Sequence, residues 1–293
     1  MARSSRINDF SRAERYELEA TRTAASINKH LYNTDTEMYN ISSTRKVGFQ
    51  QEMHSWMLIK NIAPANLRKP LMEKFKSLHK GTHNKSPLSF SKDTPNIPPV
   101  ISPIMSAFHV VAAVSTENFT EAEHVLRSVW APMCDTSSPH FTGTTWEFLL
   151  PDGTPFEDQF CSYAQLFSVG PTFILSKYVL GVEPTTAGYK SFSVNPRFPI
   201  SGVNWAQGRV PTPSGQPIIV RWQRFDKAWR LTCSAPAGLK GLVLVPKDIG
   251  ESCESISVNG LEIDPKIRKV EVGAAYGTEV DIVVRLSSSK GCV

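Results

Sequence analysis

The sequence of 293 residues is 41% hydrophobic, 20% charged and 10% aromatic, and it carries a formal net charge of +5 at pH 7. This composition excludes a disordered chain, a collagen-like chain and a small disulfide-stapled domain, and the length accommodates one large domain or two ordinary ones. No run of about 18 apolar residues occurs, so a membrane span is not expected.

The first 90 residues are the most basic part of the chain. They contain 15 basic and 8 acidic residues, interleaved as on the solvated face of a helix. No basic stripe with interleaved aromatic residues accompanies them, so we expect no nucleic-acid partner. Residues 1–12 are mainly polar and basic and are not followed by an apolar segment. We therefore expect no export signal, and a cytoplasmic location.

The five cysteines are an odd number, widely spaced and without a CxxC pair. This pattern predicts free thiols in a reducing compartment rather than a disulfide framework. Cys134 and His140 lie six residues apart, but nothing nearby supplies further ligands at zinc-like spacing, so we expect neither a metal site nor a cofactor.

Residues from about 11 to 178 show helical periodicity and predict a set of antiparallel helices. Apolar residues recur there every three or four positions, which places each set on one helix face. A helix start is predicted at residues 115–118, and long loops at residues 81–91 and 95–99. The three stripes are Ala20, Ala24, Ile27 and Leu31; Leu67, Leu71, Phe75 and Leu78; and Phe119, Ala122, Val125, Leu126 and Val129.

From about residue 184 the pattern changes to short alternating runs bounded by turn residues. Asn259-Gly260 between apolar residues is the strongest of these turn signals. Closely and regularly spaced strands indicate a β-sandwich. We therefore predict an α+β chain with a helical domain at residues 1–185 and an antiparallel β-sandwich at residues 186–293. The predicted strands are residues 218–222, 229–233, 242–245, 270–272 and 280–284.

The densest candidate for a functional site is the segment 142–147, which ends in Trp146 and Glu147. A sugar site uses such a pair: the carboxylate acts as an acid or base, and the indole stacks on a pyranose ring. The alternative is a loop glutamate that caps a helix beside a half-buried tryptophan, and the spacing alone favours this alternative.

Several ordered motifs resemble the C-terminal part of the α-L-rhamnosidases of glycoside hydrolase family 78, in particular its fungal branch. The resemblance runs from about residue 11 to about residue 284. The segment at residues 51–56 lies where the family has a Gln-Asp-x-Asn stretch. The other motifs are residues 141–147, 167–172, 178–185 and 188–190, then 205–208 and 210–215 in the region of the sandwich, and 87–91 with 101–103 upstream.

This resemblance implies a partial six-hairpin (α/α)₆ toroid followed by the sandwich. It also implies a glycosidase that removes a terminal α-L-rhamnose with inversion, acting on a carbohydrate or a glycosylated small molecule. Glu147 matches the general base of the family. The resemblance places Trp146 in the rhamnose pocket, and the expected substrate-binding residues are Trp146, Gln165, Trp56, Gln51 and Glu52.

The sequence departs from the family in two ways. Residues 11–180 hold about half of the twelve helices of a toroid, and the family carries its general acid and acidic cluster in the other half. Gln165 stands where the family typically has a histidine. These departures keep two alternatives open: a non-catalytic glycan-binding or scaffolding relative, and a protein recruited to small-molecule biosynthesis.

The partial toroid has two further consequences. An inverting base needs a second carboxyl group about 6.5–9.5 Å away. Uncovered helix faces also predict a homodimer through the open side of the toroid. The carboxylates available to act with Glu147 are Glu52, Asp135, Asp152, Glu157 and Asp158.

Overall fold

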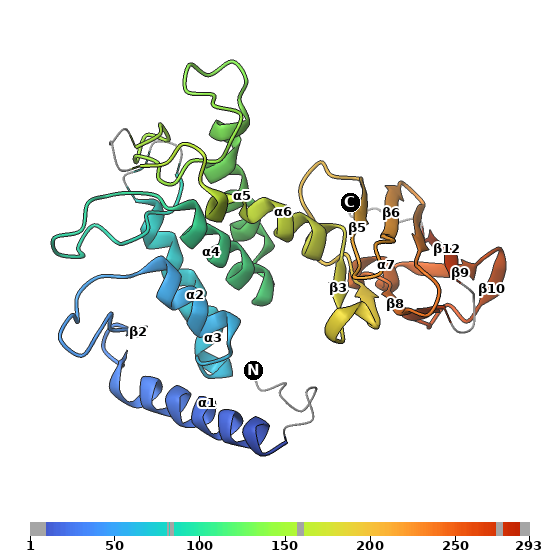
Figure 1. The fold of residues 1–293 in the computed structure, drawn as a ribbon, viewed down its shortest axis with the longest axis horizontal. Helices are drawn as coiled ribbons and strands as arrows, with labels where there is room; N and C mark the ends of the chain where they lie inside the picture. The colour runs from blue at the N-terminus through green and yellow to red at the C-terminus, as the bar shows by residue number, and fades with distance from the viewer. Residues whose placement is uncertain (1–9, 81, 83–84, 157–160, 274–277, 288–293) are drawn as a thin grey trace. The chain divides into compact units, whose positions relative to one another are not determined.

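The computed structural model describes residues 10–80, 82, 85–156, 161–273 and 278–287 (Figure 1). The chain divides into two compact units, Met1–Pro171 and Thr172–Val293. The first, the helical unit, is built mainly of helices, and the second, the sheet unit, is built mainly of strands. This order confirms the predicted α+β arrangement. Among the described residues, no helix combines the length and apolarity needed to cross a membrane.

The described residues of the helical unit form five helices of nine residues or more, joined by long loops. A two-stranded ribbon follows the first helix, and short helical turns close the third helix and precede the last. The elements are α1 (Phe10–His30), β1 (Tyr32–Asn33), β2 (Met38–Tyr39), α2 (Gln51–Ile59), α3 (Ala65–Lys74), η2 (Phe75–His79), α4 (Pro103–Ser115), α5 (Phe119–Cys134), η3 (Leu166–Ser168) and α6 (Gly170–Ile174), the last of which crosses into the sheet unit.

The three predicted apolar stripes lie on helices, namely α1, α3 with η2, and α5, except for Leu31, which directly follows the end of α1. Leu71, Phe75 and Leu78 are fully buried, as expected for a stripe that faces a core. The start of α5 also lies where it was predicted. The side chain of Asn118 accepts a hydrogen bond from the backbone N–H of Glu121 at 3.4 Å and caps this helix.

Helices α2 and α4 form the centre of the helical unit and begin at the same end of it. Ser89 forms a hydrogen bond at the start of each helix. Its carbonyl accepts from the backbone N–H of Gln51, the first residue of α2, at 3.0 Å, and its hydroxyl accepts from the backbone N–H of Ser102, directly before α4, at 2.8 Å. The two helices are therefore parallel neighbours, and α5 returns beside α4 after a three-residue connection (Figure 1). The starts of α2 and α4 thus share one face of the unit with the loops around Ser89.

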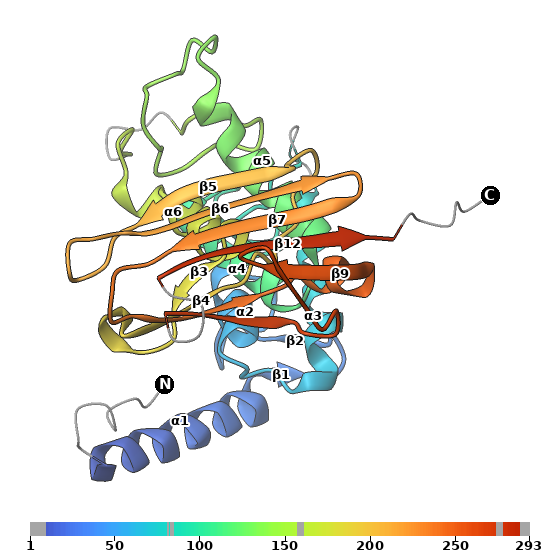
Figure 2. The same cartoon turned by 90° about the vertical axis from the view of Figure 1, so that its right-hand side faces the viewer.

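The sheet unit is built of two sheets that pack through alternating apolar residues. The larger has the strand order β10-β9-β12-β7-β6-β5 and is antiparallel throughout, and Figure 2 shows most of it side by side. The smaller has the order β11-β8-β4-β3, with β4 and β8 parallel. The elements are η4 (Leu175–Val179, a π-helical turn), β3 (Val182–Pro184), η5 (Ala187–Tyr189), β4 (Ser191–Val194), β5 (Trp205–Val210), β6 (Ile218–Phe225), β7 (Ala228–Ser234), β8 (Lys240–Leu244), α7 (Lys247–Glu251), β9 (Cys253–Val258), β10 (Leu261–Ile263), β11 (Lys269–Val272) and β12 (Glu279–Leu286).

The core of the sheet unit explains why buried and exposed residues alternate along its strands. Val220, Leu231 and Ile282 of the large sheet and Phe192 and Val243 of the small one are at most 1% exposed. The strands predicted at residues 218–222, 229–233, 242–245, 270–272 and 280–284 all lie on observed strands, β6, β7, β8, β11 and β12. The predicted Asn-Gly turn connects β9 to β10.

The sheet unit begins earlier in the chain than the predicted boundary at residues 185/186. The reason is that the turn η4 and strand β3 bond to the sheets. Trp222 donates its indole N–H to the carbonyl of Val179 at 2.9 Å, and the Tyr178 carbonyl accepts from the backbone of Arg197 at 3.0 Å. Strand β3 pairs with β4. A division at residue 185 would separate β3 from its own sheet.

Candidate active site

Glu147 lies on a loop segment that pairs with residues 162–165. Its backbone N–H donates to the carbonyl of Ser162 at 2.9 Å, and its Oε2 accepts from the backbone N–H of Ser162 at 2.9 Å. The side chain is half-buried. Among the described residues, Oε1 has no hydrogen-bond partner. The loop therefore fixes the carboxylate through one oxygen and leaves the other available to a water molecule.

Gln165 belongs to the same pair of segments. Its backbone N–H donates to the carbonyl of Thr145 at 2.8 Å, and its own carbonyl accepts from the Thr145 hydroxyl at 2.8 Å. The structure therefore brings Gln165 and Glu147 together on neighbouring strands of chain, although 18 positions separate them in the sequence. The half-buried amide of Gln165 is a neutral donor and acceptor, suited to a sugar hydroxyl.

Trp146 lies in the core of the helical unit. Its side chain is 1% exposed, and its indole N–H donates to the hydroxyl of Thr142 at 3.0 Å. Neither face of the ring is open to a ligand in this arrangement. The structure thus corrects the expectation that this indole stacks on a sugar: Trp146 anchors the loop from within and so helps to hold Glu147 in place.

The three candidates on α2 lie on two different faces of the helix. Gln51 is fully buried, whereas Glu52 and Trp56 are half-buried and, four residues apart, share one face of the helix. The Trp56 ring packs on Phe108 with centroids 4.6 Å apart, and Lys60 Nζ lies 5.0 Å from its centroid. Glu52 and Trp56 are therefore accessible to a ligand, and Gln51 is not.

A series of backbone contacts links the start of α2 to the Glu147 loop. Ser89 bonds to Gln51 N and, through its own N–H, to the carbonyl of Val100 at 2.8 Å. The next residue, Ile101, exchanges two backbone hydrogen bonds of 2.9 Å with Leu149. The start of α2 and the Glu147 loop are thus linked through residues 89–101 at the face that the starts of α2 and α4 share, although about 95 positions separate them in the sequence.

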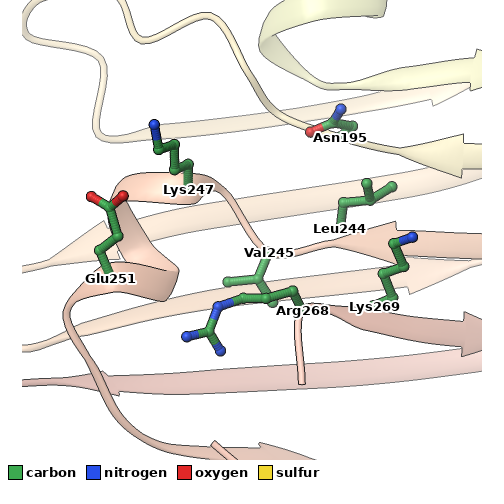
Figure 3. Close-up of a pocket in the computed structure, with 7 residues that line it drawn as sticks. All are labelled: Asn195, Leu244, Val245, Lys247, Glu251, Arg268 and Lys269. Carbon is green, nitrogen blue, oxygen red and sulfur yellow. The ribbon is translucent and has the colours of Figure 1, made fainter. Parts of the chain in front are cut away.

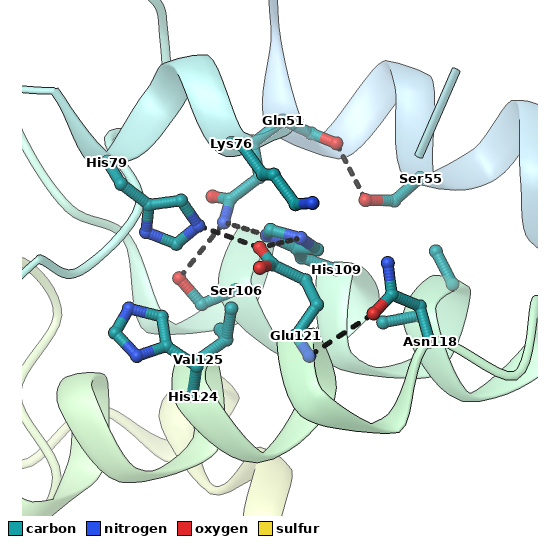
Figure 4. Close-up of polar contacts among 12 residues, drawn as sticks. Gln51, Ser55, Lys76, His79, Ser106, His109, Asn118, Glu121, His124 and Val125 are labelled. Atoms are coloured by element: carbon teal, nitrogen blue, oxygen red, sulfur yellow. Dashed lines mark hydrogen bonds and ion pairs between the residues drawn. The ribbon is translucent and has the colours of Figure 1, made fainter. Parts of the chain in front are cut away.

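Beneath this face lies a buried polar network that the sequence did not predict (Figure 4). Glu121, in the first turn of α5, lies between two histidines: its Oε1 is 2.7 Å from His79 Nε2 and 3.1 Å from His109 Nε2. Gln51 Nε2 donates to His109 Nδ1 at 3.2 Å and to Ser106 at 3.3 Å. One carboxylate thereby connects α2, η2, α4 and α5.

The hydrogen bonds set the charges in this network. His109 Nδ1 accepts from Gln51, so its proton is on Nε2 and the ring is neutral; burial lowers the pKa of His109, against the attraction of Glu121. His79 donates through both nitrogens, to the Lys85 carbonyl and to Glu121, as an imidazolium does. Burial opposes that charge, but Glu121 outweighs it and raises the pKa of His79. Burial alone would raise the pKa of Glu121, yet the two histidines lower it well below its usual range.

His54 is a second buried histidine in the same unit. Its Nδ1 donates to the carbonyl of Gln50 at 2.7 Å, and its ring stacks on Phe49 with centroids 3.8 Å apart. Burial lowers the pKa of His54 to about 4, although the Gln50 carbonyl favours the charged form. His54 is therefore neutral at physiological pH and acts as a packing and hydrogen-bonding group.

The carboxylates considered as partners of Glu147 fall into three groups. Asp135 and Asp152 close local turns, accepting hydrogen bonds from Ser137 and Thr154, respectively. Glu52 stays accessible on α2. Glu157 and Asp158 lie outside the described residues. Within the described part of the chain, no three His, Cys, Asp or Glu side chains are arranged to hold a metal ion.

The comparisons with known proteins agree with the resemblance found in the sequence. The family model for the bacterial alpha-L-rhamnosidase C-terminal domain matches residues 181–257, which run from the residue before β3 into β9. The structure of an α-L-rhamnosidase from Dictyoglumus thermophilum has a TM-score of 0.66 and 14% identity, covering 96% of this chain and 30% of its own. The chain carries the α-L-rhamnosidase fold.

Two further α-L-rhamnosidase structures lead to the same conclusion. The Streptomyces avermitilis enzyme, complexed with L-rhamnose, has a TM-score of 0.61 and 18% identity over 93% of this chain and 24% of its own. The Aspergillus terreus enzyme has a TM-score of 0.61 and 13% identity over 96% of this chain and 28% of its own. The chain thus spans less than a third of each of these α-L-rhamnosidases. Comparison with curated protein sequences gave no significant match.

Proposed function

We propose that this chain takes part in the hydrolysis of a terminal α-L-rhamnose from a glycoside, with inversion and with Glu147 as the general base. The observation that carries the proposal is the carboxylate of Glu147, which is half-buried and held through Oε2 by Ser162 while Oε1 has no partner among the described residues. A general base needs this combination of fixed orientation and one accessible oxygen. The α-L-rhamnosidase fold supplies the substrate class.

The other predicted residues take separate parts in this proposal. Gln165 hydrogen-bonds a sugar hydroxyl beside Glu147, and Glu52 and Trp56 contact the glycoside from α2. Gln51, buried beneath them, orients His109 and the start of α2. The general acid then comes from outside the described residues, for example from a further segment like those that the longer α-L-rhamnosidases carry.

An aryl α-L-rhamnoside with a good leaving group tests this assignment, because its departure needs little protonation. We expect the wild-type chain to hydrolyse this substrate and to release rhamnose with inverted configuration at the anomeric carbon. Glu147→Gln should reduce turnover by about 10²–10⁴-fold, since it removes the base and keeps the shape of the side chain. Glu254→Gln, on an exposed position of β9, is the matched control and should leave turnover unchanged. Equal turnover in wild type and Glu147→Gln, or none in either, contradicts the proposal.

The burial of Trp146 and Gln51 favours a second candidate function, a glycan-binding relative that does not hydrolyse its ligand. Both side chains were expected at the sugar, and both are at most 1% exposed. This candidate predicts that L-rhamnose shifts the amide resonances of the Glu147 and Gln165 segments while the activated rhamnoside stays intact. The same shifts in the presence of turnover favour the hydrolase instead.

We also propose that a second copy of the chain covers the apolar segment around η3. Leu166 and Phe167 are 74% and 71% exposed, and Val169 beside them is also exposed. Adjacent apolar side chains this open are typical of a surface that binds another protein. Size-exclusion chromatography with light scattering should give a dimer that Leu166→Ser/Phe167→Ser converts to a monomer. A well-behaved wild-type monomer contradicts the self-association.

A further inference from the structure

A pocket of about 380 Å³ lies within the sheet unit, where α7 and the loop before β11 meet the end of β8 (Figure 3). None of its lining residues is among those discussed for rhamnose. Its wall carries three cationic side chains and one carboxylate, together with an amide and two apolar residues. The lining residues are Asn195, Leu244, Val245, Lys247, Glu251, Arg268 and Lys269.

Arg268 is a fixed part of this wall. Its guanidinium donates Nη2 to the carbonyl of Gly250 at 2.6 Å and Nη1 to the carbonyl of Ile267 at 3.1 Å. The guanidinium lies so close to α7 that a Cβ at position 250 would be 2.4 Å from Arg268 Nε, so a larger residue there would displace the Arg268 side chain. These acceptors are neutral carbonyls, so the positive charge of Arg268 is held in place without being neutralised.

The two lysines of the pocket add uncompensated charge. Lys247 opens α7 and Lys269 opens β11, and both are exposed. In the described part of the chain neither lysine forms an ion pair. Glu251, one turn after Lys247, is also without an ion-pair partner there and provides an acceptor at the rim (Figure 3). The pocket therefore has a positive potential that a bound anion would satisfy.

The remaining lining residues suit a sugar ring. Leu244 and the buried Val245 contribute apolar surface, against which the C–H face of a pyranose packs. Asn195 is held by its backbone, whose N–H donates to the carbonyl of Gly181 at 2.8 Å. Its side-chain amide has no hydrogen-bond partner among the described residues, so it is available to a hydroxyl group.

We propose that this pocket binds an acidic sugar, a uronic acid residue of a saccharide. The positive charge of Lys247, Lys269 and Arg268 attracts the carboxylate, the ring packs on Leu244 and Val245, and hydroxyl groups of the saccharide bond to Asn195 or Glu251. Charge sets the preference for an acid, and the apolar and amide groups set the preference for a saccharide over a simple anion. Binding here is independent of Glu147 and of any hydrolysis.

A titration of the full chain with methyl glucuronide and methyl glucoside, followed by NMR, tests the proposal. The two ligands differ in one group, a carboxylate against a hydroxymethyl. We expect the glucuronide to bind with a millimolar Kd and to shift the signals of Asn195 and Val245, and the glucoside to bind at least tenfold more weakly. Raising the salt concentration should weaken glucuronide binding, because the contact is ionic.

Variants and other anions complete the test. Lys247→Ala/Lys269→Ala should weaken glucuronide binding at least tenfold, and Lys227→Ala/Lys240→Ala, exposed lysines elsewhere in the sheet unit, should not change it. Acetate and inorganic phosphate should bind more weakly than the glucuronide. Equal binding of glucuronide and glucoside, tighter binding of phosphate, or an unchanged Kd in Lys247→Ala/Lys269→Ala each overturns the proposal.

Discussion

The two units of the chain differ in what they bury. In the helical unit the core includes the connected side chains of Gln51, His109 and Glu121, and separately His54, which bonds to the Gln50 carbonyl. In the described part of the sheet unit the buried polar side chains are those of Ser193 and Thr212, and the rest of the core is apolar. Buried polar networks impose a specific geometry at a cost in desolvation, whereas an apolar core supports a scaffold.

This difference matches the division of chemistry between the units. The candidate base Glu147 and the network beneath it belong to the helical unit, which needs fixed side-chain positions. The sheet unit keeps its charges on the outside, as in the exposed pair of Arg230 and Asp281 at 2.7 Å and in the walls of the pocket beside α7. The stability of the helical unit should therefore depend on charge and pH far more than that of the sheet unit does.

The largest expected effect comes from Glu121→Gln. This change leaves the buried imidazolium of His79 without its counter-ion and should lower the free energy of unfolding of the helical unit by about 3–5 kcal/mol. Asp281→Asn breaks the exposed ion pair of the sheet unit and should cost less than about 1 kcal/mol. Hydrogen exchange, which reports on α4 and α5 separately from β7 and β12, measures both. Equal losses of unfolding free energy in the two units would contradict the inference that the helical unit depends more strongly on buried charge.

The second effect is the pH dependence of the helical unit. Burial lowers the pKa of His54 to about 4 in the folded chain, whereas an ordinary histidine has a pKa of about 6.5. Between these values the unfolded chain binds a proton that the folded chain excludes, so stability falls as the pH falls, by up to about 3 kcal/mol. His109, whose pKa is also lowered, acts in the same direction. His79 acts oppositely: its raised pKa stabilises the fold below pH 6.5, and this contribution is lost as the pH rises through the folded value.

Urea unfolding at pH 7.5 and pH 5, with hydrogen exchange in α2 and α4 as the probe, measures this dependence. His54→Asn keeps a donor for the Gln50 carbonyl and cannot become charged, so it should reduce the loss at pH 5. His30→Asn, at the exposed end of α1, is the control and should retain the wild-type loss. A change in stability between the two pH values that is the same in His54→Asn as in the wild type contradicts the assignment of His54.

Phe192→Ala, in the apolar core of the sheet unit, should cost about 3–5 kcal/mol at both pH values.

The sequence predicted the parts of the fold that have one polar and one apolar face. The stripe of α5 and the alternation of β6 and β12 follow this rule, because each packs on one side only. Helix α4 was missed since it is apolar almost all round, as expected for an element buried between neighbours. Strand β5 was missed for the opposite reason. It lies at the edge of its sheet with alternate residues exposed, and Gly208 breaks the pattern of apolar side chains along it.

The candidate site shows the same limit. Glu147 and Gln165 came from motifs, and their pairing through Thr145 and Ser162 is a tertiary contact that no spacing encodes. His79, His109 and Glu121 are more than ten positions apart from one another, and no pattern joins them. The available signal was the Asn118-x-x-Glu121 spacing at the start of α5, which predicts a helix cap but not a carboxylate that faces inward.

The last effect we predict is smaller than the losses expected in the helical unit and concerns the Asn259-Gly260 turn of the sheet unit, where backbone conformation rather than charge sets stability. Both residues have positive φ, 52° and 82°, as a two-residue hairpin between β9 and β10 requires. Gly260→Ala places a Cβ in this left-handed region and should cost about 1–2 kcal/mol, although the space around it is open. The cost should be the same at pH 5 and pH 7.5 and should appear as faster hydrogen exchange in β9 and β10. A cost that changes with pH would show that the sheet unit, too, depends on titrating groups.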